Sequence, residues 1–311
     1  MNYQIYKLQF KTGLHIGKGK LTDGAAVFQA DTLFSALCIE ALKLGGEQML
    51  LQLVEKVEHG HILLSDGLPF IDNRLYIPKP MLQIKGKEES DAREKKAYKK
   101  LEYVPEDVFE SYLQGAMDVK KENDFFSANF GTYHVRTMAN VKEGHDTEPY
   151  NVGVYSFQEG SGLYVIVGFE NEEDYFFLGD LFESLAYTGI GGKRSSGLGK
   201  FHICVTIPPE SLMERLEHKK SGKCYMALSQ CLPSEEDMDS VIDGAQYGML
   251  KRSGFVDSQC YAAVFRKKRD FFVFKAGSCF LRPFDGIVAD VSEGGNHPVY
   301  CYAKAMLMEI G

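Results

Sequence analysis

The sequence has no tryptophan, and several further scarcities each exclude a class of protein. No apolar run approaches the roughly 20 residues that a membrane helix needs, and the N-terminal MNYQIYKLQF alternates like a strand rather than resembling a signal peptide. The seven cysteines are odd in number and form no Cys-x-x-Cys pair, so neither a disulfide framework nor a zinc site is indicated. Reduced thiols without export signals predict a cytoplasmic protein that makes no membrane contact.

Basic residues are fewer than acidic ones: 35 lysines and arginines stand against 43 aspartates and glutamates, so the formal net charge is -8. A protein that coats nucleic acid passively is basic as a rule, so any RNA or DNA binding has to come from local basic patches. What the chain does have is 311 residues, of which 44% are hydrophobic, and this is enough for about two domains with real cores. Its 17 tyrosines and 21 phenylalanines provide surfaces on which nucleobases can stack.

The first part of the chain predicts an α+β unit that is interrupted by a long insertion. Its expected elements are, in order, strand 3–10, helix 30–46 capped by Asp31 or Thr32, helix 47–58, two short strands within 61–80, strand 163–169, helix 173–187 and strand 200–207. With the insertion removed this order is βαββαβ, which is the arrangement of a ferredoxin-like, or RRM-like, unit.

The insertion, at about 84–157, has two parts of different character. Residues 84–102 are dense in charge and predict an exposed helix or a mobile segment. Two alternating runs, 132–139 and 150–157, flank a polar tip at 142–149. They predict a long β-hairpin that stands off the domain.

Pro208 and Pro209 mark a domain boundary that divides the chain into 1–207 and 208–311. The basic cluster of the second unit, RKKR at 266–269, is interpreted as a turn with solvated charges, with an RNA or partner contact as the alternative. In this unit we expect a short helix at 235–244 and strands at 223–228, 246–251, 259–265, 271–275 and 299–305.

The segment GIGGKRSSGLGKF, 189–201, is the strongest binding motif of the chain. A P-loop would need glycine in place of Tyr187 and serine or threonine in place of Arg194, and a dinucleotide-binding turn needs a strand before it and a helix after it, the reverse of the order here. Glycines let a backbone approach a polyanion, while lysine, arginine and serine supply charge and donors. We expect phosphate binding by Gly189, Gly191, Gly192, Lys193, Arg194, Ser195, Ser196, Gly197 and Gly199.

This segment resembles the G-rich loop of RAMP proteins, the RRM-like subunits of CRISPR effector complexes. The stretches that resemble one branch, the Cas-five-like fourth Csm subunit of type III-A complexes, are FKTGLHIGKG (10–19), ADTLFSAL (30–37), KRSGFVDSQ (251–259), RDFFVFKAGSCF (269–280) and VSEGGNHPVYCYAKAMLM (291–308). The resemblance implies two ferredoxin-like units and a non-catalytic subunit without cofactor or metal. It implies binding to the 5′ tag of the guide RNA (crRNA) and to target RNA, with the large polymerase/cyclase-like subunit and a RAMP backbone subunit as partners.

The resemblance also makes the predicted hairpin a thumb that distorts the guide–target duplex. An apolar side chain that inserts between bases kinks a duplex, and the candidates in the hairpin are His134, Val135, Arg136 and Met138. An ordinary surface hairpin is the alternative. Aromatic residues on the RRM-like sheet are expected to stack on RNA bases.

His15 leaves an enzymatic alternative open. RAMP relatives that process guide RNA cut it without metal, with a histidine as general acid or base, and His15 lies in a glycine-rich loop near Lys18 and Lys20. A metal-independent endoribonuclease is therefore the alternative function. We favour RNA contact or packing for His15 and RNA contact for Lys18 and Lys20, although surface lysines need no explanation. No His or Asp grouping has the spacing of metal ligands.

Overall fold

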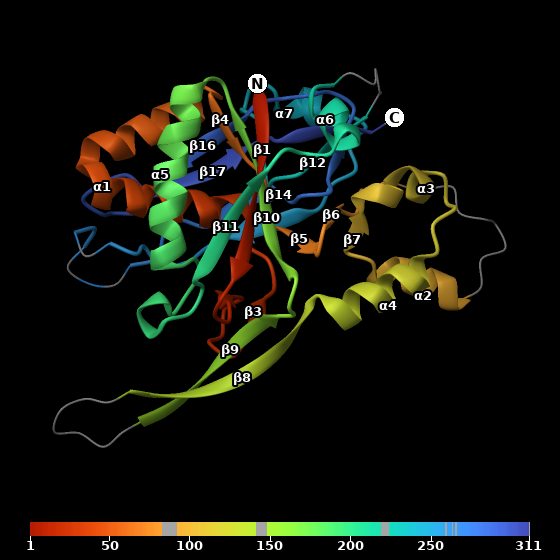
Figure 1. Ribbon diagram of the computed structural model, residues 1–311. Coiled ribbons are helices and arrows are strands. Elements are labelled where there is room, and N and C mark those ends of the chain that lie inside the picture. Colours follow the sequence, from red (N-terminus) through yellow and green to blue (C-terminus); the bar gives the residue numbers. More distant parts are fainter. Residues whose placement is uncertain are drawn as a thin grey trace.

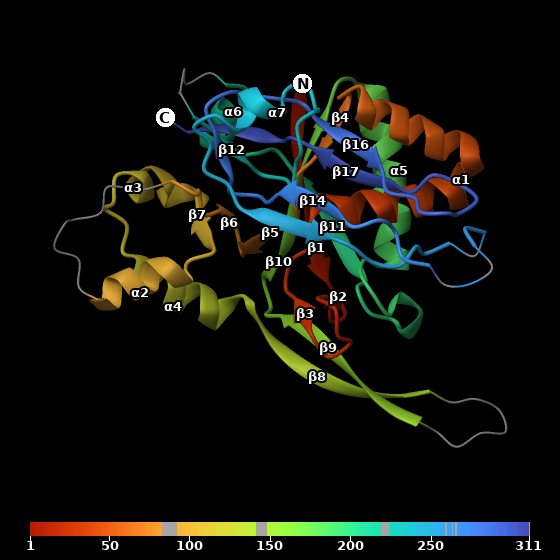
Figure 2. The same ribbon diagram turned by 180° about the vertical axis from the view of Figure 1, so that it is seen from behind.

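The computed structural model describes residues 1–82, 92–140, 148–218, 224–258, 260–262, 264 and 266–310, with the backbone alone for 92–95 and 140. Figure 1 shows a central sheet with two long helices, a two-stranded hairpin that projects from the body, and a helical segment beside it. Figure 2, from behind, shows the C-terminal strands covering the other side of the sheet.

The N-terminal half builds a seven-stranded sheet in the order β11-β1-β10-β5-β6-β7, with β4 paired to β10. Every one of these pairings is antiparallel. The predicted strands at 3–10, 163–169 and 200–207 are confirmed. The strands are β1 (Asn2–Phe10), β4 (Ile62–Leu64), β5 (Leu68–Ile71), β6 (Arg74–Pro78), β7 (Tyr103–Pro105), β10 (Ser161–Phe169) and β11 (Phe201–Thr206).

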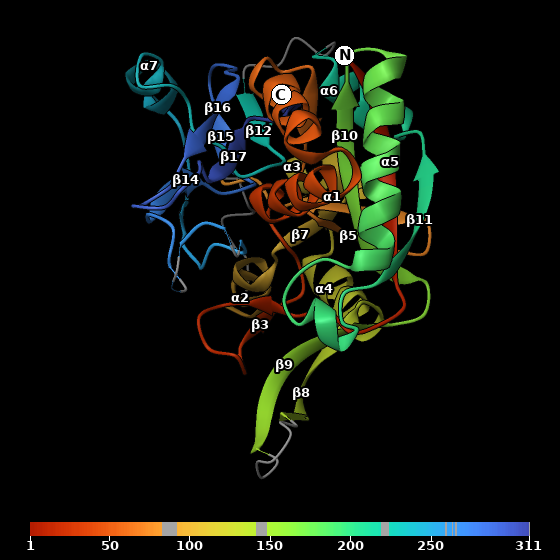
Figure 3. The same ribbon diagram turned by 90° about the vertical axis from the view of Figure 1, so that its left-hand side faces the viewer.

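The long helices α1 (Ala30–Glu58) and α5 (Glu172–Thr188) cover one face of this sheet (Figure 3). The two helices predicted at 30–46 and 47–58 are confirmed: α1 comprises two helices that meet at a kink, where Gly46 has a non-helical φ of 65°.

The predicted cap of α1 is wrong. Gln29 occupies the N-cap position without a side-chain hydrogen bond, and neither Asp31 nor Thr32 caps the helix. Instead the Ala30 N–H donates to Oδ1 of Asp66 at 2.8 Å. The first N–H of the helix is therefore satisfied by a residue of the β4–β5 connection, which no local pattern indicates.

Both faces of the central strand β10 are buried. Val165 and Val167 pack toward the helices, while Tyr164 and Ile166 alternate to the other face and pack against the C-terminal half. Tyr164 and Phe70 are thereby removed from solvent. The expectation that aromatic residues of this sheet stack on RNA bases is therefore wrong for these strands, because other parts of the chain already cover them.

The insertion contains helices and the predicted hairpin. The hairpin is confirmed: its strands pair antiparallel from Gly131 opposite Phe157 to Asn140 opposite Glu148. Of its predicted tip at 142–149, residues 142–147 lie outside the described residues. The elements are α2 (Ala92–Lys100), η1 (Glu106–Val108), α3 (Phe109–Leu113), α4 (Val119–Asn129), β8 (Gly131–Asn140) and β9 (Glu148–Phe157).

The C-terminal half has short strands in three small sheets, β15-β12-β18, β13-β14 and β16-β17. The strand predicted at 259–265 is wrong in its described part, because 260–262 and 264 are turn, bend or irregular chain. The elements are α6 (Glu210–Leu216), β12 (Cys224–Ala227), α7 (Met238–Ile242), β13 (Met249–Arg252), β14 (Phe271–Phe274), β15 (Cys279–Phe280), β16 (Gly286–Asp290), β17 (Tyr300–Lys304) and β18 (Leu307–Ile310).

The two halves share hydrophobic cores, although no sheet of the described residues crosses 207/208. Tyr302 of β17 enters the core under α1 and exchanges two hydrogen bonds with the backbone of Leu64, at 2.8 and 3.0 Å. Oδ1 of Asp66 also accepts from the Gln230 N–H at 2.9 Å. These contacts fix the C-terminal half against the sheet. Within the described residues, no helix has both the length and the apolar character to span a bilayer.

Candidate nucleic-acid interface

The G-rich loop, residues 189–200, connects α5 to β11 (Figure 1), and its Leu198 packs against Val152 and Val154 of β9. Gly189, Gly191, Gly197 and Gly199 have φ between 77° and 89°, and Lys193 also adopts a left-handed conformation with φ 60°. Residues that carry a Cβ rarely adopt this left-handed conformation, whereas glycine adopts it readily. The succession of turns therefore depends on glycine at these four positions.

Most of these glycines serve the packing of the loop on its own chain. A Cβ on Gly199 would lie 2.0 Å from the Ile190 carbonyl oxygen, and one on Gly191 would lie 2.6 Å from that of His15. The Ile190 N–H donates to the Gly199 carbonyl oxygen at 3.0 Å, and the Gly192 N–H donates to the His15 carbonyl oxygen at 2.8 Å. The close approach that the sequence suggested for a polyanion is thus made by protein backbone. At Gly197 the added Cβ would meet no described atom within 4 Å.

The polar side chains of the loop are held between the hairpin and the C-terminal half. Nζ of Lys193 lies 4.6 Å from the ring centroid of Tyr150 in β9, and Nη2 of Arg194 donates to Oδ2 of Asp257 at 2.5 Å. Ser195 and Ser196 are exposed. The loop therefore presents three cations and two hydroxyls: Lys193 and Arg194 each have a contact within the chain, and Lys200 is exposed.

A groove of about 790 Å³ opens beside the loop and continues along the start of α1 to the C-terminal half. We call it the basic groove, because six lysines and arginines line it against two aspartates, Asp31 and Asp257. Local positive charge of this kind is what an acidic protein needs in order to bind a polyanion. The six cations are Lys18, Arg194, Lys251, Arg252, Lys267 and Lys268.

Asp31 serves as a buried counter-ion in the wall of this groove. It is 2% exposed, and its two oxygens accept from Nε and Nη2 of Arg252 at 2.8 and 2.7 Å. Nζ of Lys268 lies 3.8 Å from the same carboxylate. A carboxylate and guanidinium in this two-point geometry hold each other firmly, so Asp31 joins α1 to β13.

His15 lies against Gly192 of the G-rich loop and is one of the residues that line the basic groove. It is 5% exposed, and its Nδ1 lies 2.6 Å from the Gly153 carbonyl oxygen. A carbonyl only accepts, so Nδ1 carries the hydrogen of this bond. The histidine thus links the N-terminal segment, the G-rich loop and β9. Lys18 and Lys20 are exposed, and Lys18 lines the groove.

The candidate wedge residues of the hairpin differ in their surroundings. Met138 is half-buried and packs against a small cluster of Val152, Val154 and Leu198. His134, Val135 and Arg136 are exposed. Val135, at 52% exposure, is the apolar candidate whose side chain is available to a ligand.

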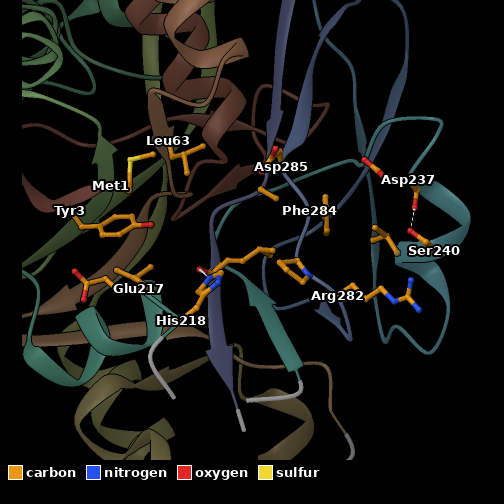
Figure 4. Close-up of a pocket in the computed structure, with 15 residues that line it drawn as sticks. Met1, Tyr3, Leu63, Glu217, His218, Asp237, Ser240, Arg282, Phe284 and Asp285 are labelled. Carbon is orange, nitrogen blue, oxygen red and sulfur yellow. Dashed lines mark hydrogen bonds between the residues drawn. The ribbon is translucent and has the colours of Figure 1, made fainter. Parts of the chain in front are cut away.

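A second cavity, also of about 790 Å³, lies near the N-terminus and was not indicated by the sequence. Figure 4 shows Met1, Tyr3 and Leu63 on one side of it, facing Arg282 and Phe284 of the C-terminal half. We call it the acidic cavity, because three carboxylates, Glu217, Asp237 and Asp285, line it against one arginine, Arg282. Three carboxylates make it a poor site for a phosphate polymer.

Within the described part of the chain, no three His, Cys, Asp or Glu side chains come together as metal ligands would.

The family model for the CRISPR Csm4 C-terminal domain matches residues 220–310. A Csm4 protein of Mycobacterium tuberculosis (strain CDC 1551 / Oshkosh) is 35% identical over 313 residues, which cover 100% of this chain and 98% of the relative. The chain belongs to the Csm4 family. A Csm4 protein of Streptococcus thermophilus is 30% identical over 318 residues, covering 100% of this chain and 99% of the relative.

Solved structures of Csm4-containing complexes have the same fold. A chain of a Csm3–Csm4 subcomplex from the type III-A interference complex aligns with a TM-score of 0.68 and 19% identity, covering 100% of both chains. A chain of a Csm1–Csm4 cassette in complex with pppApA aligns with a TM-score of 0.61 and 17% identity, covering 99% of this chain and 98% of the other. The mixed α/β architecture with antiparallel sheets is thus shared with these Csm4-containing structures.

Proposed function

We propose that this chain is a non-catalytic, guide-RNA-binding subunit of a type III-A CRISPR effector complex, and that its basic groove holds the 5′ tag of the crRNA. The observation that carries the proposal is the convergence of six cations from distant parts of the chain on one groove beside the G-rich loop. Single-stranded nucleic acid binds in positively charged grooves that follow its backbone. Arg194 can grip a phosphate at two points, and Ser195 and Ser196 add donors.

The domain organisation supports this proposal. The four strands β11, β1, β10 and β4 are neighbours in that order, and α1 and α5 pack on one face. With their chain order this fits a ferredoxin-like unit at 1–207. We assign 208–311 as the second unit of this kind, and we infer a cytoplasmic location from the seven free cysteines.

The solved relatives suggest the partners. They contain Csm3 in one case and Csm1 in the other, so we assign a RAMP backbone subunit and the large polymerase/cyclase-like subunit as neighbours of this chain. The hairpin β8–β9 is the proposed thumb, and Val135 its proposed wedge between bases of the guide–target duplex. Deleting residues 135–150 should leave tag binding intact and restore the base pair beside the tag in chemical probing.

No observation favours the ribonuclease alternative. General acid–base catalysis needs a histidine within hydrogen-bond reach of the reacting oxygen. The ring of His15 is buried and its Nδ1 is engaged by the backbone of β9. We therefore assign His15 a positioning role.

The test is RNA binding and RNA cleavage by the full-length chain. Fluorescence anisotropy with a labelled repeat RNA should show that Lys193→Ala/Arg194→Ala weakens affinity roughly tenfold or more. The same RNA incubated in EDTA should stay intact. Unchanged affinity of the double variant would point to a protein-only scaffold. Site-specific cleavage that is lost in His15→Ala would establish the nuclease instead.

A further inference from the structure

The wall of the basic groove opposite the G-rich loop carries an exposed aromatic ring. Phe255 is 51% exposed and lines the groove. Among the described lining residues it is the one phenylalanine or tyrosine. Exposure of a large apolar ring to water is unfavourable. In single-strand binding sites such a ring is the usual surface on which a nucleobase stacks.

The backbone beneath this ring is fixed. Residue 255 bridges residue 267 in antiparallel fashion, the Val256 N–H donates to Arg266 at 3.0 Å, and the Lys268 N–H donates to Gly254 at 2.9 Å. Two residues beyond the ring, Oδ2 of Asp257 accepts a hydrogen bond from Nη2 of Arg194 in the G-rich loop at 2.5 Å. The backbone that carries the ring is therefore held at a defined place in the groove wall, joined to the loop through Asp257.

Lysines lie near the ring. Nζ of Lys267 lies 5.5 Å from its centroid, and Lys251 and Lys268 line the same wall. A flat base can approach such a ring while its phosphate reaches a lysine.

We propose that Phe255 stacks on a base of single-stranded RNA in the basic groove and that Lys267 binds an adjacent phosphate. The C-terminal unit then forms the second wall of the RNA site, opposite the G-rich loop. This inference rests on the proposed function and adds to it a base-stacking position and the residues that form it.

The experiment uses the full-length chain and an oligoadenylate of about eight nucleotides, within the site sizes of single-strand binding folds. Phe255→Ala should lower affinity about tenfold without changing the salt dependence, and Phe255→Tyr should restore it. Lys267→Ala should reduce the slope of log Kobs against log[salt] by about one. Phe272→Ala is the matched control, because Phe272 is 53% exposed on the adjacent β14 but does not line the groove.

A second readout reports stacking directly. Oligoadenylates with 2-aminopurine at successive positions should show one position whose fluorescence is quenched by the wild-type chain and by Phe255→Tyr, but not by Phe255→Leu. If Lys193→Ala/Arg194→Ala loses affinity while Phe255→Ala and Phe272→Ala both bind like wild type, the stacking inference is wrong and the proposed function stands. If none of these variants changes affinity, both are wrong.

Discussion

The basic groove and the acidic cavity have the same volume, about 790 Å³ each, and opposite charge. One lies beyond the C-terminal end of β1, near Lys18, and the other at its N-terminal end, near Met1. Volume therefore does not distinguish a nucleic-acid site from another hollow in this molecule. The sign of the lining charge does, because a phosphate polymer gains from a positive groove and is repelled by carboxylates.

Several cations of the basic groove are already in ion pairs. In the basic groove, carboxylates of the same chain already neutralise several cations: Asp31 binds Arg252, Asp270 binds Lys251 at 2.6 Å, and Asp257 binds Arg194. Some of these ion pairs stabilise the fold, and others have to break before the cation can bind an RNA phosphate. Burial decides which, since a buried pair is costly to break and an exposed pair is not.

The largest effect is expected from the buried pair. Asp31→Ala leaves the guanidinium of Arg252 without its carboxylate, so the free energy of unfolding should fall by about 3 kcal/mol or more in urea titrations. The matched control is Asp285→Ala, an exposed carboxylate of the acidic cavity, which should change it by less than about 0.5 kcal/mol. Equal losses in the two variants would show that Asp31 does not differ from a surface carboxylate.

A second effect concerns pH. Burial raises the pKa of Asp66 to about 7, with a smaller contribution from Asp31, against the hydrogen bonds from Gln230 and Ala30. The folded pKa lies above the ordinary aspartate value of 3.8, so the stabilisation is complete in acid, below about pH 4, and is lost as the pH rises through about 7. Wild type should therefore lose stability relative to Asp66→Asn between about pH 4 and pH 8. Urea titrations that give a constant difference over this range would contradict the shift.

The smallest effect is expected from the exposed pair. Asp257→Asn releases Arg194 for phosphate, so affinity for single-stranded RNA should rise about two- to fivefold, in line with the low strength of exposed ion pairs. Asp285→Asn removes a carboxylate from the acidic cavity and should leave affinity unchanged. Anisotropy titrations at one salt concentration compare the two variants. Weaker binding by Asp257→Asn would mean that the ion pair positions Arg194 for RNA rather than competing with it.

Periodicity in the sequence predicted the elements whose partners are regular neighbours. The alternation at 3–10 and in the hairpin, and the helical spacing at 30–58 and 173–187, correspond to β1, β8–β9, α1 and α5. The glycine-rich segment was recognisable because its chemistry lies in consecutive residues. By contrast, β15, β16 and β18 are short strands without a distinct alternation, and no pattern of residues predicted them.

The groove was predictable on one wall only. Lys18 and Arg194 stood in recognised motifs, whereas Lys267 and Lys268 were interpreted as solvated charges in a turn. They line the groove because the fold brings residues 250–257 and 267–268 across from residue 194, a contact between residues far apart in sequence. The cap of α1 by Asp66 and the burial of both faces of β10 have the same cause. Each depends on which parts of the chain pack together, and the local pattern of residues does not record that.

One measurement compares the two cavities most directly, the salt dependence of RNA affinity for one arginine from each. Arg194→Ala in the basic groove should reduce the slope of log Kobs against log[salt] by about one, because one phosphate contact is lost. Arg282→Ala in the acidic cavity should leave the slope at the wild-type value. Equal slopes for wild type and Arg194→Ala, or a reduction in Arg282→Ala alone, would contradict the assignment of RNA to the basic groove.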